Sequence, residues 1–550
     1  GWTYNHAPTL AYWNDRFYLE YLSNPQDEHI EPGHTLLATS DDGLTWSQPM
    51  VVFPHYEPPK GVELAKGARG YMMHQRMGFF TAPNGRLLLL AFYGHAEDPF
   101  EKGGIGRVVR EAYKDGSFGP IYFIRYTSHA DWNATNTSYP FYTDSEDAGF
   151  KEACEAMLND KLKRRQWMDE DRGLDGFFDG KPGSPGEDAP EAFNYYYRPD
   201  GVIVGLYKWS HAALSFDGGD TFSDPVKLST FTMAGGKQWG QKTDDGRYAI
   251  LYNPTVHNEH RYPLIVISSD DGVMYDDMLL VHCEVPPRRF FGRWKDYGPC
   301  YVRGIMEGNG NPPGEDMWVT YSVNKEDIWV SRVPLPIRYA VEGDVEDDFE
   351  AMEPGGIISD WNIYSGQWTP ADIGVDDAGN HSIRLQDRDP YDYARAVRIV
   401  QEGTALKASF RVSTAQTDNG LLEIDVMDRF GSRPVRLRFD VDGQIKALDG
   451  AEEKVLQAYE ADTWYDIVLE VDATPYGLYS VMINGEKVLE DAQLAEAVKS
   501  VERLSFRTGP FRDLPKRETD NEKPHKPLKG GDDPVASATF YVDDVVAMRK

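Results

Sequence analysis

One short acidic turn recurs in this chain and constrains its fold more than any other feature. It reads Thr39-x-Asp41-x-Gly43-x-Thr45-Trp46 in "TSDDGLTW", and related turns follow at Ser215–Phe222 and, less well kept, at Ser268–Tyr275. An aspartate in such a turn accepts backbone N–H groups, the glycine supplies a positive φ, and the aromatic residue anchors the returning strand. The shared order of hydroxyl, acid, glycine and aromatic predicts a repeated β-hairpin.

Other hairpin signals fill the first part of the chain. Asn-Gly or Asp-Gly precedes a β-rich run in "APNGRLLLLAFYG" (82–94), "RPDGVIVGLYKW" (198–209) and "TDDGRYAILYN" (243–253). The turns at Ser215 and Ser268 are spaced almost like the ~40–50 residues of a four-stranded propeller blade. Dividing the first part of the chain by that period predicts a seven-bladed β-propeller, or a six-bladed one if insertions are long.

The propeller is expected to span residues 1–340 and to contain one insertion. Residues Gly149–Ala192 hold a helix-like run, "KEACEAMLNDKLKRRQW", and then a Gly/Pro/Asp-rich stretch without strand periodicity. The segment "DMWVTYSVNKEDIWVSRVPLPI" reads as the closing blade, and an acidic linker follows it. Alternating runs such as "KASFRV" and "WYDIVLEV" then predict a C-terminal β-sandwich of the jelly-roll type over 341–550, with "ATFYVDDVVAM" pairing near "DDFE".

Composition excludes several kinds of protein. The 550 residues carry a formal net charge of −32, which argues against a nucleic-acid partner. No hydrophobic run approaches the roughly 20 residues that a membrane span needs. The three cysteines allow at most one disulfide. We expect a secreted or periplasmic protein whose export signal has been removed.

Three segments carry a resemblance to a known family: "MMHQRMGFFTAPNGRLLLLAFYGH", "GRVVREAYKDGSFGPIYFIRY" and "YSVNKEDIWVSRVPLPI". Together they resemble the propellers of L-rhamnose-α-1,4-D-glucuronate lyases and related α-L-rhamnosidases, and more distantly those of ulvan lyases. The acidic turns resemble the Asp-boxes of sialidase-like propellers, which are structural. The Arg-Ile-Pro tripeptide that begins the sialidase carboxylate clamp does not occur in this sequence.

The resemblance to the lyases implies a site with two histidines, a tyrosine and an arginine. His74 and His95 match the spacing of the two histidines, and they flank the turn Asn84-Gly85, so adjacent strands are expected to bring both to one end of a blade. Histidine suits proton transfer near neutral pH, and Tyr207 is a candidate in reserve. Each of the three could instead have a purely structural role, the histidines as polar groups at strand ends and Tyr207 as a core aromatic.

A uronate substrate also needs positive charge and a sugar-stacking surface. Arginine and lysine hold a carboxylate and stabilise it as it becomes enolate-like during β-elimination. Trp239 in "KQWGQK" is the candidate stacking platform, with propeller packing as its alternative. The candidate cations near predicted strand ends are Arg76, Lys208, Lys237, Arg261 and Arg303.

These residues predict a carbohydrate-active enzyme. The favoured reaction is release of a terminal sugar, L-rhamnose, from a glucuronate-containing glycan by β-elimination. Hydrolysis of the same linkage class and non-catalytic glycan binding stay open as alternatives. No cofactor is needed for this chemistry; the resemblance suggests a structural calcium ion whose ligands the sequence does not identify.

Overall fold

The structure is a computed structural model, and its described residues divide into two compact units. It describes residues 1–63, 70–95, 104–127, 131–168, 192–233, 235–256, 260–306, 310, 312, 314–509 and 526–549; the side chains of 72–77 and of 168 are outside this description. The first unit comprises Gly1–Ile337 with Lys516–Leu528, and the second comprises Arg338–Pro515 with Lys529–Lys550.

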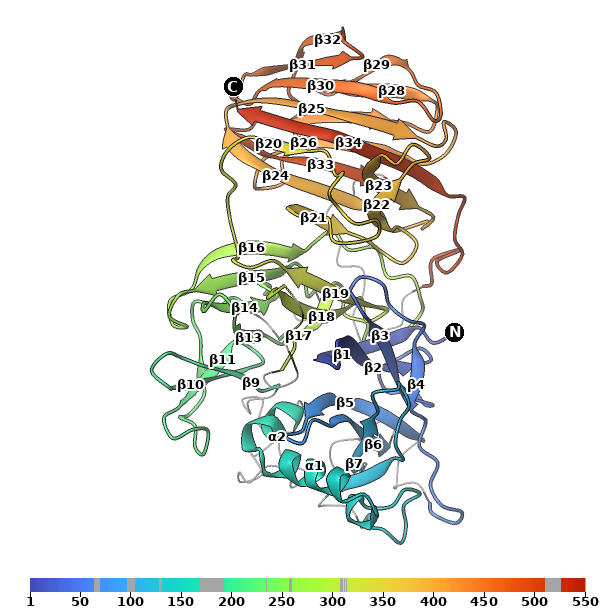
Figure 1. Cartoon of the computed structure of the whole chain (residues 1–550), viewed down its shortest axis with the longest axis vertical. Helices are drawn as coiled ribbons and strands as arrows, with labels where there is room; N and C mark the ends of the chain where they lie inside the picture. Colours follow the sequence, from blue (N-terminus) through green and yellow to red (C-terminus); the bar gives the residue numbers. More distant parts are fainter. Residues whose placement is uncertain are drawn as a thin grey trace. The chain divides into compact units, whose positions relative to one another are not determined.

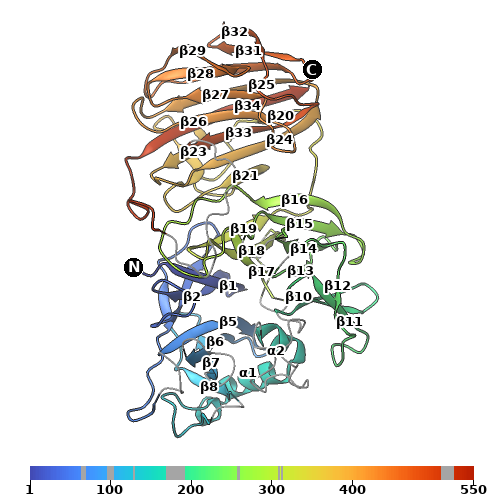
Figure 2. The same cartoon turned by 180° about the vertical axis from the view of Figure 1, so that it is seen from behind.

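The first unit is built from five antiparallel sheets in chain order (Figures 1 and 2). Four sheets have four strands and the last has three. The strands of blades one to three are β1 (Tyr4–Trp13), β2 (Arg16–Asn24), β3 (His34–Ser40), β4 (Met50–Phe53); β5 (Tyr71–Thr81), β6 (Leu87–His95), β7 (Gly104–Ala112), β8 (Tyr122–Tyr126); and β9 (Asn194–Tyr197), β10 (Ile203–Tyr207), β11 (His211–Ser215), β12 (Val226–Lys227). Those of blades four and five are β13 (Trp239–Lys242), β14 (Tyr248–Tyr252), β15 (Leu264–Ser269), β16 (Asp276–His282); and β17 (Pro299–Gly304), β18 (Met317–Val323), β19 (Asp327–Val333).

The propeller therefore has five blades, and the prediction of seven or six was wrong. The prediction assumed one uniform repeat, but the connections between blades are long and unequal. The connection from β8 to β9 alone runs from residue 127 to residue 193. It contains the predicted helical insertion, as the helices α1 (Ala148–Asn159) and α2 (Lys161–Met168), preceded by the short 3₁₀ helix η1 (Tyr142–Asp144). Residues in such connections were counted as blades.

The local hairpin predictions were correct in position. The Asn-Gly and Asp-Gly turns join the first and second strands of blades two, three and four, and the acidic turns join the third and fourth strands of blades one, three and four. The segment expected to close the propeller forms β18 and β19 of the last blade.

The acid that holds the first acidic turn lies one residue later than its sequence alignment predicted. Asp42, rather than Asp41, accepts the N–H groups of Leu44 at 2.8 Å and Thr45 at 2.7 Å. Burial raises the pKa of Asp42, but these hydrogen bonds outweigh it and the pKa lies below its ordinary value. Asp41 instead pairs with Arg16 at 2.7 Å.

The third turn shows the same shift, and the second follows its predicted register. Asp271 accepts the N–H groups of Val273 and Met274, while Asp270 pairs with Arg247 at 2.6 Å. Asp217 accepts the N–H of Thr221 at 2.9 Å, as aligned. Adjacent aspartates in "DDG" are indistinguishable by type, so only the backbone geometry separates the turn-holding acid from its exposed neighbour.

Blade five closes the ring by packing beside blade one, without exchange of a strand between them. Asn5 N–H donates to the carbonyl of Lys325 at 2.9 Å, and Lys295 Nζ donates to the carbonyl of Thr3 at 2.8 Å. Lys295 also pairs with the buried Glu326 at 3.0 Å. These contacts hold the first residues of the chain against the last blade, so the first and the last blade are neighbours in the ring.

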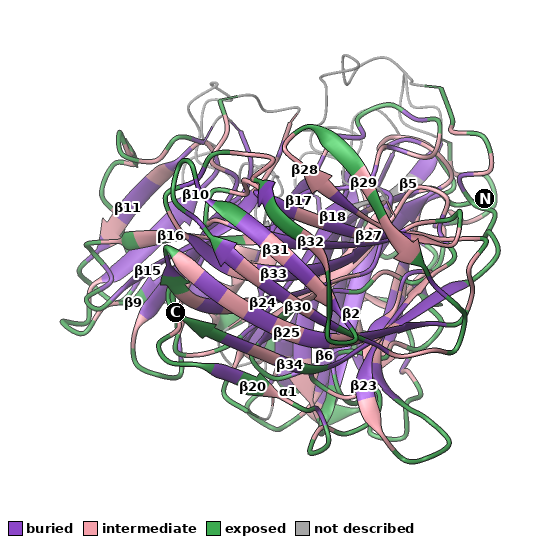
Figure 3. Cartoon of the chain, turned by 90° about the horizontal axis from the view of Figure 1, so that it is seen from above, coloured by how far each residue is buried: buried purple, intermediate pink, exposed green. Residues whose placement is uncertain are grey.

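The second unit is a sandwich of two antiparallel sheets, and the predicted alternation is visible along its strands (Figure 3). β25, for example, alternates between buried and half-buried residues along most of its length. One sheet contains β20 (Val345–Asp347), β22 (Ala371–Val375), β23 (His381–Asp387), β25 (Ala405–Thr414), β30 (Tyr465–Asp472), β31 (Leu478–Ile483), β32 (Glu486–Gln493) and β34 (Ala538–Arg549). The other contains β21 (Trp361–Tyr364), β24 (Arg395–Gly403), β26 (Leu422–Met427), β27 (Val435–Phe439), β28 (Gln444–Asp449), β29 (Glu452–Ala458) and β33 (Val501–Thr508).

The predicted pairing of the final strand is confirmed, since Asp347 at the start of the sandwich lies opposite Val545 of β34.

The three cysteines, Cys154, Cys283 and Cys300, are free thiols. Among the described residues, no helix is long and apolar enough to cross a membrane.

Candidate functional site

Tyr301 marks the centre of the candidate site on the innermost strand of blade five. Its φ is +58°, and the pairing of β17 with β18 shifts register between Cys300 and Arg303. Such a bulge adds a residue to one strand and re-aims its side chain, and bulges are frequent next to active sites. β1 has the same kind of register shift between His6 and Thr9, with Ala7 at φ +50°. Inner strands of neighbouring blades are thus bent where they face the axis.

Basic side chains from four different segments surround the ring of Tyr301, which is only 4% exposed. Each comes from a connection or strand end of the propeller, and each is buried. The distances to the ring centroid are 3.9 Å from Lys237 Nζ, 4.8 Å from Arg261 Cζ, 5.3 Å from Lys208 Nζ and 5.9 Å from Lys325 Nζ. We call these four residues with Tyr301 the Tyr301 cluster.

Two acids lie against part of this cluster. Asp296 is 3.1 Å from Arg261 Nη2 and 3.0 Å from Lys325 Nζ, and Glu28 is 3.1 Å from Lys325 Nζ. Burial alone lowers the pKa of Lys325, but the attraction of Asp296 and Glu28 more than offsets it, so the pKa is raised and the ammonium stays charged. The cluster therefore combines fixed positive charge with two carboxylates that pair with part of it.

Two further polar rings complete the surroundings of Tyr301. The His6 ring is 4.3 Å from the Tyr301 ring, and its Nδ1 is hydrogen-bonded to Ser322 Oγ at 2.8 Å. Burial, and after it the nearby charge of Glu28, raises the pKa of Tyr4 well above its usual range, so this phenol stays protonated. Histidine and tyrosine at this position give the site both a titratable base and a hydroxyl donor.

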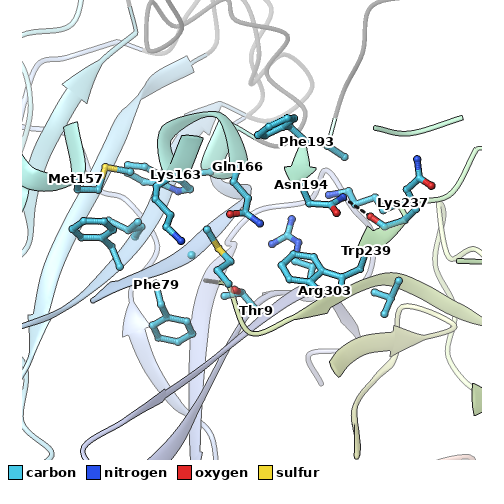
Figure 4. Close-up of a pocket in the computed structure, with 18 residues that line it drawn as sticks. Thr9, Phe79, Met157, Lys163, Gln166, Phe193, Asn194, Lys237, Trp239 and Arg303 are labelled. Atoms are coloured by element: carbon cyan, nitrogen blue, oxygen red, sulfur yellow. Dashed lines mark hydrogen bonds between the residues drawn. The ribbon is translucent and has the colours of Figure 1, made fainter. Parts of the chain in front are cut away.

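A pocket lies beside the Tyr301 cluster, between helix α2 and the inner strands (Figure 4). Its polar lining comes from Thr9 of β1, Asn194 of β9, Arg303 of β17 and, from α2, Lys163 and Gln166. Lys237 belongs both to this lining and to the Tyr301 cluster. Apolar walls are supplied by Phe79, Phe80, Met157, Trp167, Phe193 and Trp239. The pocket and the cluster are therefore neighbouring parts of one region at the propeller axis.

The structure brings together five of the nine residues proposed from sequence. Lys208, Lys237 and Arg261 surround Tyr301, and Trp239 and Arg303 line the adjoining pocket. Trp239 is 5% exposed, and its Nε1 donates to Gln241 Oε1 at 2.8 Å, so only its ring is offered to the pocket. The roles assigned to these residues stay predictions.

The proposed proton-transfer residues lie elsewhere or outside the described side chains. His95 ends β6 and is fully buried, with its ring 4.5 Å from Tyr71 and 5.7 Å from Trp132. Tyr207 packs on Phe193 at 5.4 Å, and burial raises its pKa to about 12, with Arg165 acting in the opposite direction. The side chains of His74 and Arg76 are not among those described.

In the sequence, Tyr301 is equally consistent with a site residue and with a core aromatic, and no pattern singles out Glu28, Asp296 or Lys325. These residues come from blade one and blade five, far apart in the chain, and meet only because the ring closes. The positive φ of Tyr301 has no signature in "GPCYVRG". Among the described residues, no three His, Cys, Asp or Glu side chains gather as a metal site would require, and the structural calcium ion remains a prediction.

Comparisons with known proteins agree with the architecture of both units. Residues 1–183 match a family model described as a BT_1020-like N-terminal β-propeller, and residues 361–523 match one described as a sialidase-like CBM domain. A solved structure entitled "Sialidase" is 38% identical with a TM-score of 0.92, over 100% of this chain and 50% of that chain. The chain thus spans about half the length of this relative.

Weaker similarities add nothing to this assignment. A Trypanosoma rangeli sialidase is 11% identical over 100% of this chain and 92% of its own, with a TM-score of 0.35. An alginate lyase is 13% identical over 38% and 98%, with a TM-score of 0.26. A comparison with curated proteins gives no significant match. Over the matched residues the chain is similar to a BT_1020-like β-propeller and to a sialidase-like CBM domain, which supports a carbohydrate-active role. The resemblance to rhamnose–glucuronate lyases gains no support.

Proposed function

We propose that the propeller hydrolyses the glycosidic bond of a terminal, carboxylate-bearing sugar at the Tyr301 cluster. The observation that carries this proposal is the convergence of Lys208, Lys237, Arg261 and Lys325 on one buried tyrosine. In a chain of net charge −32, such a concentration of positive charge is a local exception. A buried cation cluster of this kind suits a sugar carboxylate, which accepts charge-assisted hydrogen bonds from lysine and arginine.

Tyr301 is the candidate nucleophile in this reaction. Sialidases are glycosidases that use a tyrosine in this role. As the phenol oxygen attacks the anomeric carbon, its proton would pass through a carboxylate of the cluster to the leaving oxygen, whose bond to the sugar breaks. Water would then attack the anomeric carbon, its hydroxyl would remain on the released sugar, and its other proton would return to the tyrosine oxygen as the tyrosine–sugar bond breaks. Surrounding cations stabilise the negative charge on the attacking oxygen, and Asp296 or Glu28 is close enough to the cluster to take part in proton transfer.

The similarity to a protein entitled "Sialidase" supports this choice of substrate class. Sialic acid is a sugar with a carboxylate at its anomeric carbon, and the same arrangement of cations would hold that group. Release of L-rhamnose from glucuronate by β-elimination stays a prediction from the sequence. Among the described side chains, His95 is packed inside blade two, so no contact there favours elimination over hydrolysis.

The test is a panel of synthetic substrates with the full chain. We would measure release of 4-methylumbelliferone from its N-acetylneuraminide, glucuronide and α-L-rhamnoside, and the ultraviolet absorbance of an unsaturated uronate from a rhamnosyl-glucuronate oligosaccharide. Turnover of an acidic glycoside without unsaturated product is expected. Turnover of the neutral rhamnoside alone, or formation of the unsaturated product, would contradict the proposal.

A tyrosine variant then tests the assigned residue. Tyr301→Phe keeps the ring and its cation contacts but removes the attacking oxygen, so kcat should fall roughly 10³-fold or more. The matched control is Tyr196→Phe, because that hydroxyl donates to the carbonyl of Gly272 at 2.9 Å, from blade three to the acidic turn of blade four. Equal activity of Tyr301→Phe and the wild type would exclude Tyr301 as the nucleophile.

A further inference from the structure

Helix α2 is inserted between two blades of the propeller and packs beside the inner strands. It lies in the connection between blades two and three, and none of the five sheets contains it. The carbonyl of Trp167 accepts a hydrogen bond from Arg107 Nη1 at 3.2 Å, and the Arg107 guanidinium lies 4.9 Å from the Trp167 ring. At its other end, Lys161 Nζ pairs with Asp220 at 2.6 Å. The contact of buried Arg107 with Trp167 and the packing of Leu162 in the apolar cluster of blade three hold the helix in place. The exposed Lys161–Asp220 pair adds little to this.

This orientation turns Lys163 and Gln166 toward the pocket. Figure 4 shows both side chains directed into the space that Arg303 and Thr9 face from the inner strands. Lys163 Nζ and Gln166 Oε1 are buried atoms, and among the described residues Gln166 Oε1 has no hydrogen-bond partner. A buried amide oxygen without a partner destabilises the folded chain, so a group that donates a hydrogen bond to it is expected.

The chemistry of the lining identifies that group. An amide oxygen accepts a hydroxyl hydrogen, a lysine ammonium donates to a hydroxyl oxygen, and apolar rings such as Phe79 and Phe193 pack against C–H groups. A polyhydroxylated carbon skeleton, such as that of a sugar, makes all three kinds of contact, because its hydroxyls donate and accept hydrogen bonds and its C–H groups pack on the rings. Lys237, with its Nζ 3.9 Å from the Tyr301 ring, joins this lining to the carboxylate-binding cluster. A sugar bound at the cluster can therefore reach this lining with a hydroxyl-bearing substituent, which is what a cavity of about 30 Å³ admits.

We propose that α2 makes the propeller selective among acidic sugars, with Gln166 and Lys163 binding the hydroxylated part of the sugar that lies away from its carboxylate. This inference rests on the proposed function for the position of the carboxylate. It assigns to the inserted helix the role of a specificity element, while the five blades supply the charge and the reacting groups. Gln166 and Lys163 are then specificity-determining residues that discriminate between sugars sharing the carboxylate.

The test compares Gln166→Leu and Lys163→Met with Lys161→Met. All three remove a polar group from α2, but Lys161 is the exposed partner of Asp220, with 56% of its side chain accessible. Binding of free N-acetylneuraminic acid and of D-glucuronic acid to the full chain is measured by isothermal titration calorimetry. We expect each pocket variant to weaken the tighter-bound sugar at least fivefold and to reduce the ratio between the two affinities. Lys161→Met should leave both affinities unchanged.

Two results separate the failure of this inference from failure of the proposed function. If Gln166→Leu and Lys163→Met keep the wild-type ratio of affinities while melting as the wild type does, α2 does not determine selectivity. If neither sugar binds the wild type but the neutral methyl α-L-rhamnoside does, the carboxylate assignment itself is wrong. A change in sugar preference without any turnover would support the inference and refute hydrolysis. Should a pocket variant fail to fold, Gln166→Glu, which keeps the shape, replaces it and must weaken the same sugar.

Discussion

A buried carboxyl group in the sandwich should make this unit lose stability as the pH rises toward neutrality. Asp425 of β26 is 1% exposed and lies beside Glu423 on the same strand face. Burial, and after it repulsion from Glu423, raises the pKa of Asp425 to about 7 from 3.8; Arg433, with Nη1 at 3.6 Å, acts against this. The folded unit therefore holds this proton over a pH range in which the unfolded chain has lost it.

The size and sign of the effect follow from linkage. A raised pKa in the folded state contributes stability that is fully present below pH 3.8 and is lost as the pH rises through about 7. A difference of about three pKa units corresponds to on the order of 4 kcal/mol. Asparagine has no proton to lose, so Asp425→Asn should gain about that much stability relative to the wild type between pH 4 and pH 8.

Calorimetric unfolding of the full chain from pH 4 to pH 8 measures this difference. Hydrogen exchange in peptides from β26 assigns the relevant transition to the sandwich. Asp418→Asn, at an exposed position of the same unit, is the control and should follow the wild-type curve. If the Asp425→Asn and wild-type curves ran parallel over the whole range, the carboxyl would be ionised in the folded state and the reasoning would fail.

Three further predictions concern the propeller. Asp42→Ala should lower the melting temperature, because two turn N–H groups lose their acceptor, whereas Asp41→Ala should change it little; the reverse order in thermal unfolding would restore the alignment made from sequence. His95→Ala should cost about 2–4 kcal/mol of stability, because a fully buried ring is lost; lost turnover with unchanged unfolding would instead support its catalytic role. Burial raises the pKa of Glu20 well above 4.5, so the stability that its proton contributes is lost progressively as the pH rises above 4.5. Glu20→Gln should therefore raise the melting temperature more at pH 9 than at pH 5, and an equal rise at both would show a carboxylate that is ionised in the folded state.

Local features of the fold were readable because each depends on residues close in sequence. The hairpin at Asn84-Gly85, the helical insertion and the alternation in β25 all follow from turn chemistry and side-chain periodicity. Even the pairing of β34 with Asp347 could be inferred from the composition of the two chain segments. The number of blades could not be inferred from the sequence, because it depends on how many residues lie in the connections between blades. The connection at 127–193 is much longer than a uniform repeat would predict.

In the candidate site, too, some residues could be predicted from the sequence and others only from the tertiary structure. Lys208, Lys237 and Arg261 were found because cations at predicted strand ends of a propeller tend to face its axis. Their convergence on Tyr301 was not foreseeable, because a bulge turns that side chain and because Glu28 pairs with Lys325 only when blade five packs beside blade one.

The sequence by itself determined the all-β class, the hairpins and the supply of basic and aromatic side chains. These depend on backbone preferences and on the alternation of polar and apolar residues, which act over a few positions. The tertiary structure decided the five-blade count, the acids that pair with Arg261 and Lys325, and the position of Tyr301 among four basic side chains. The physical reason is that burial and charge pairing act across space, so they are set only when distant segments meet.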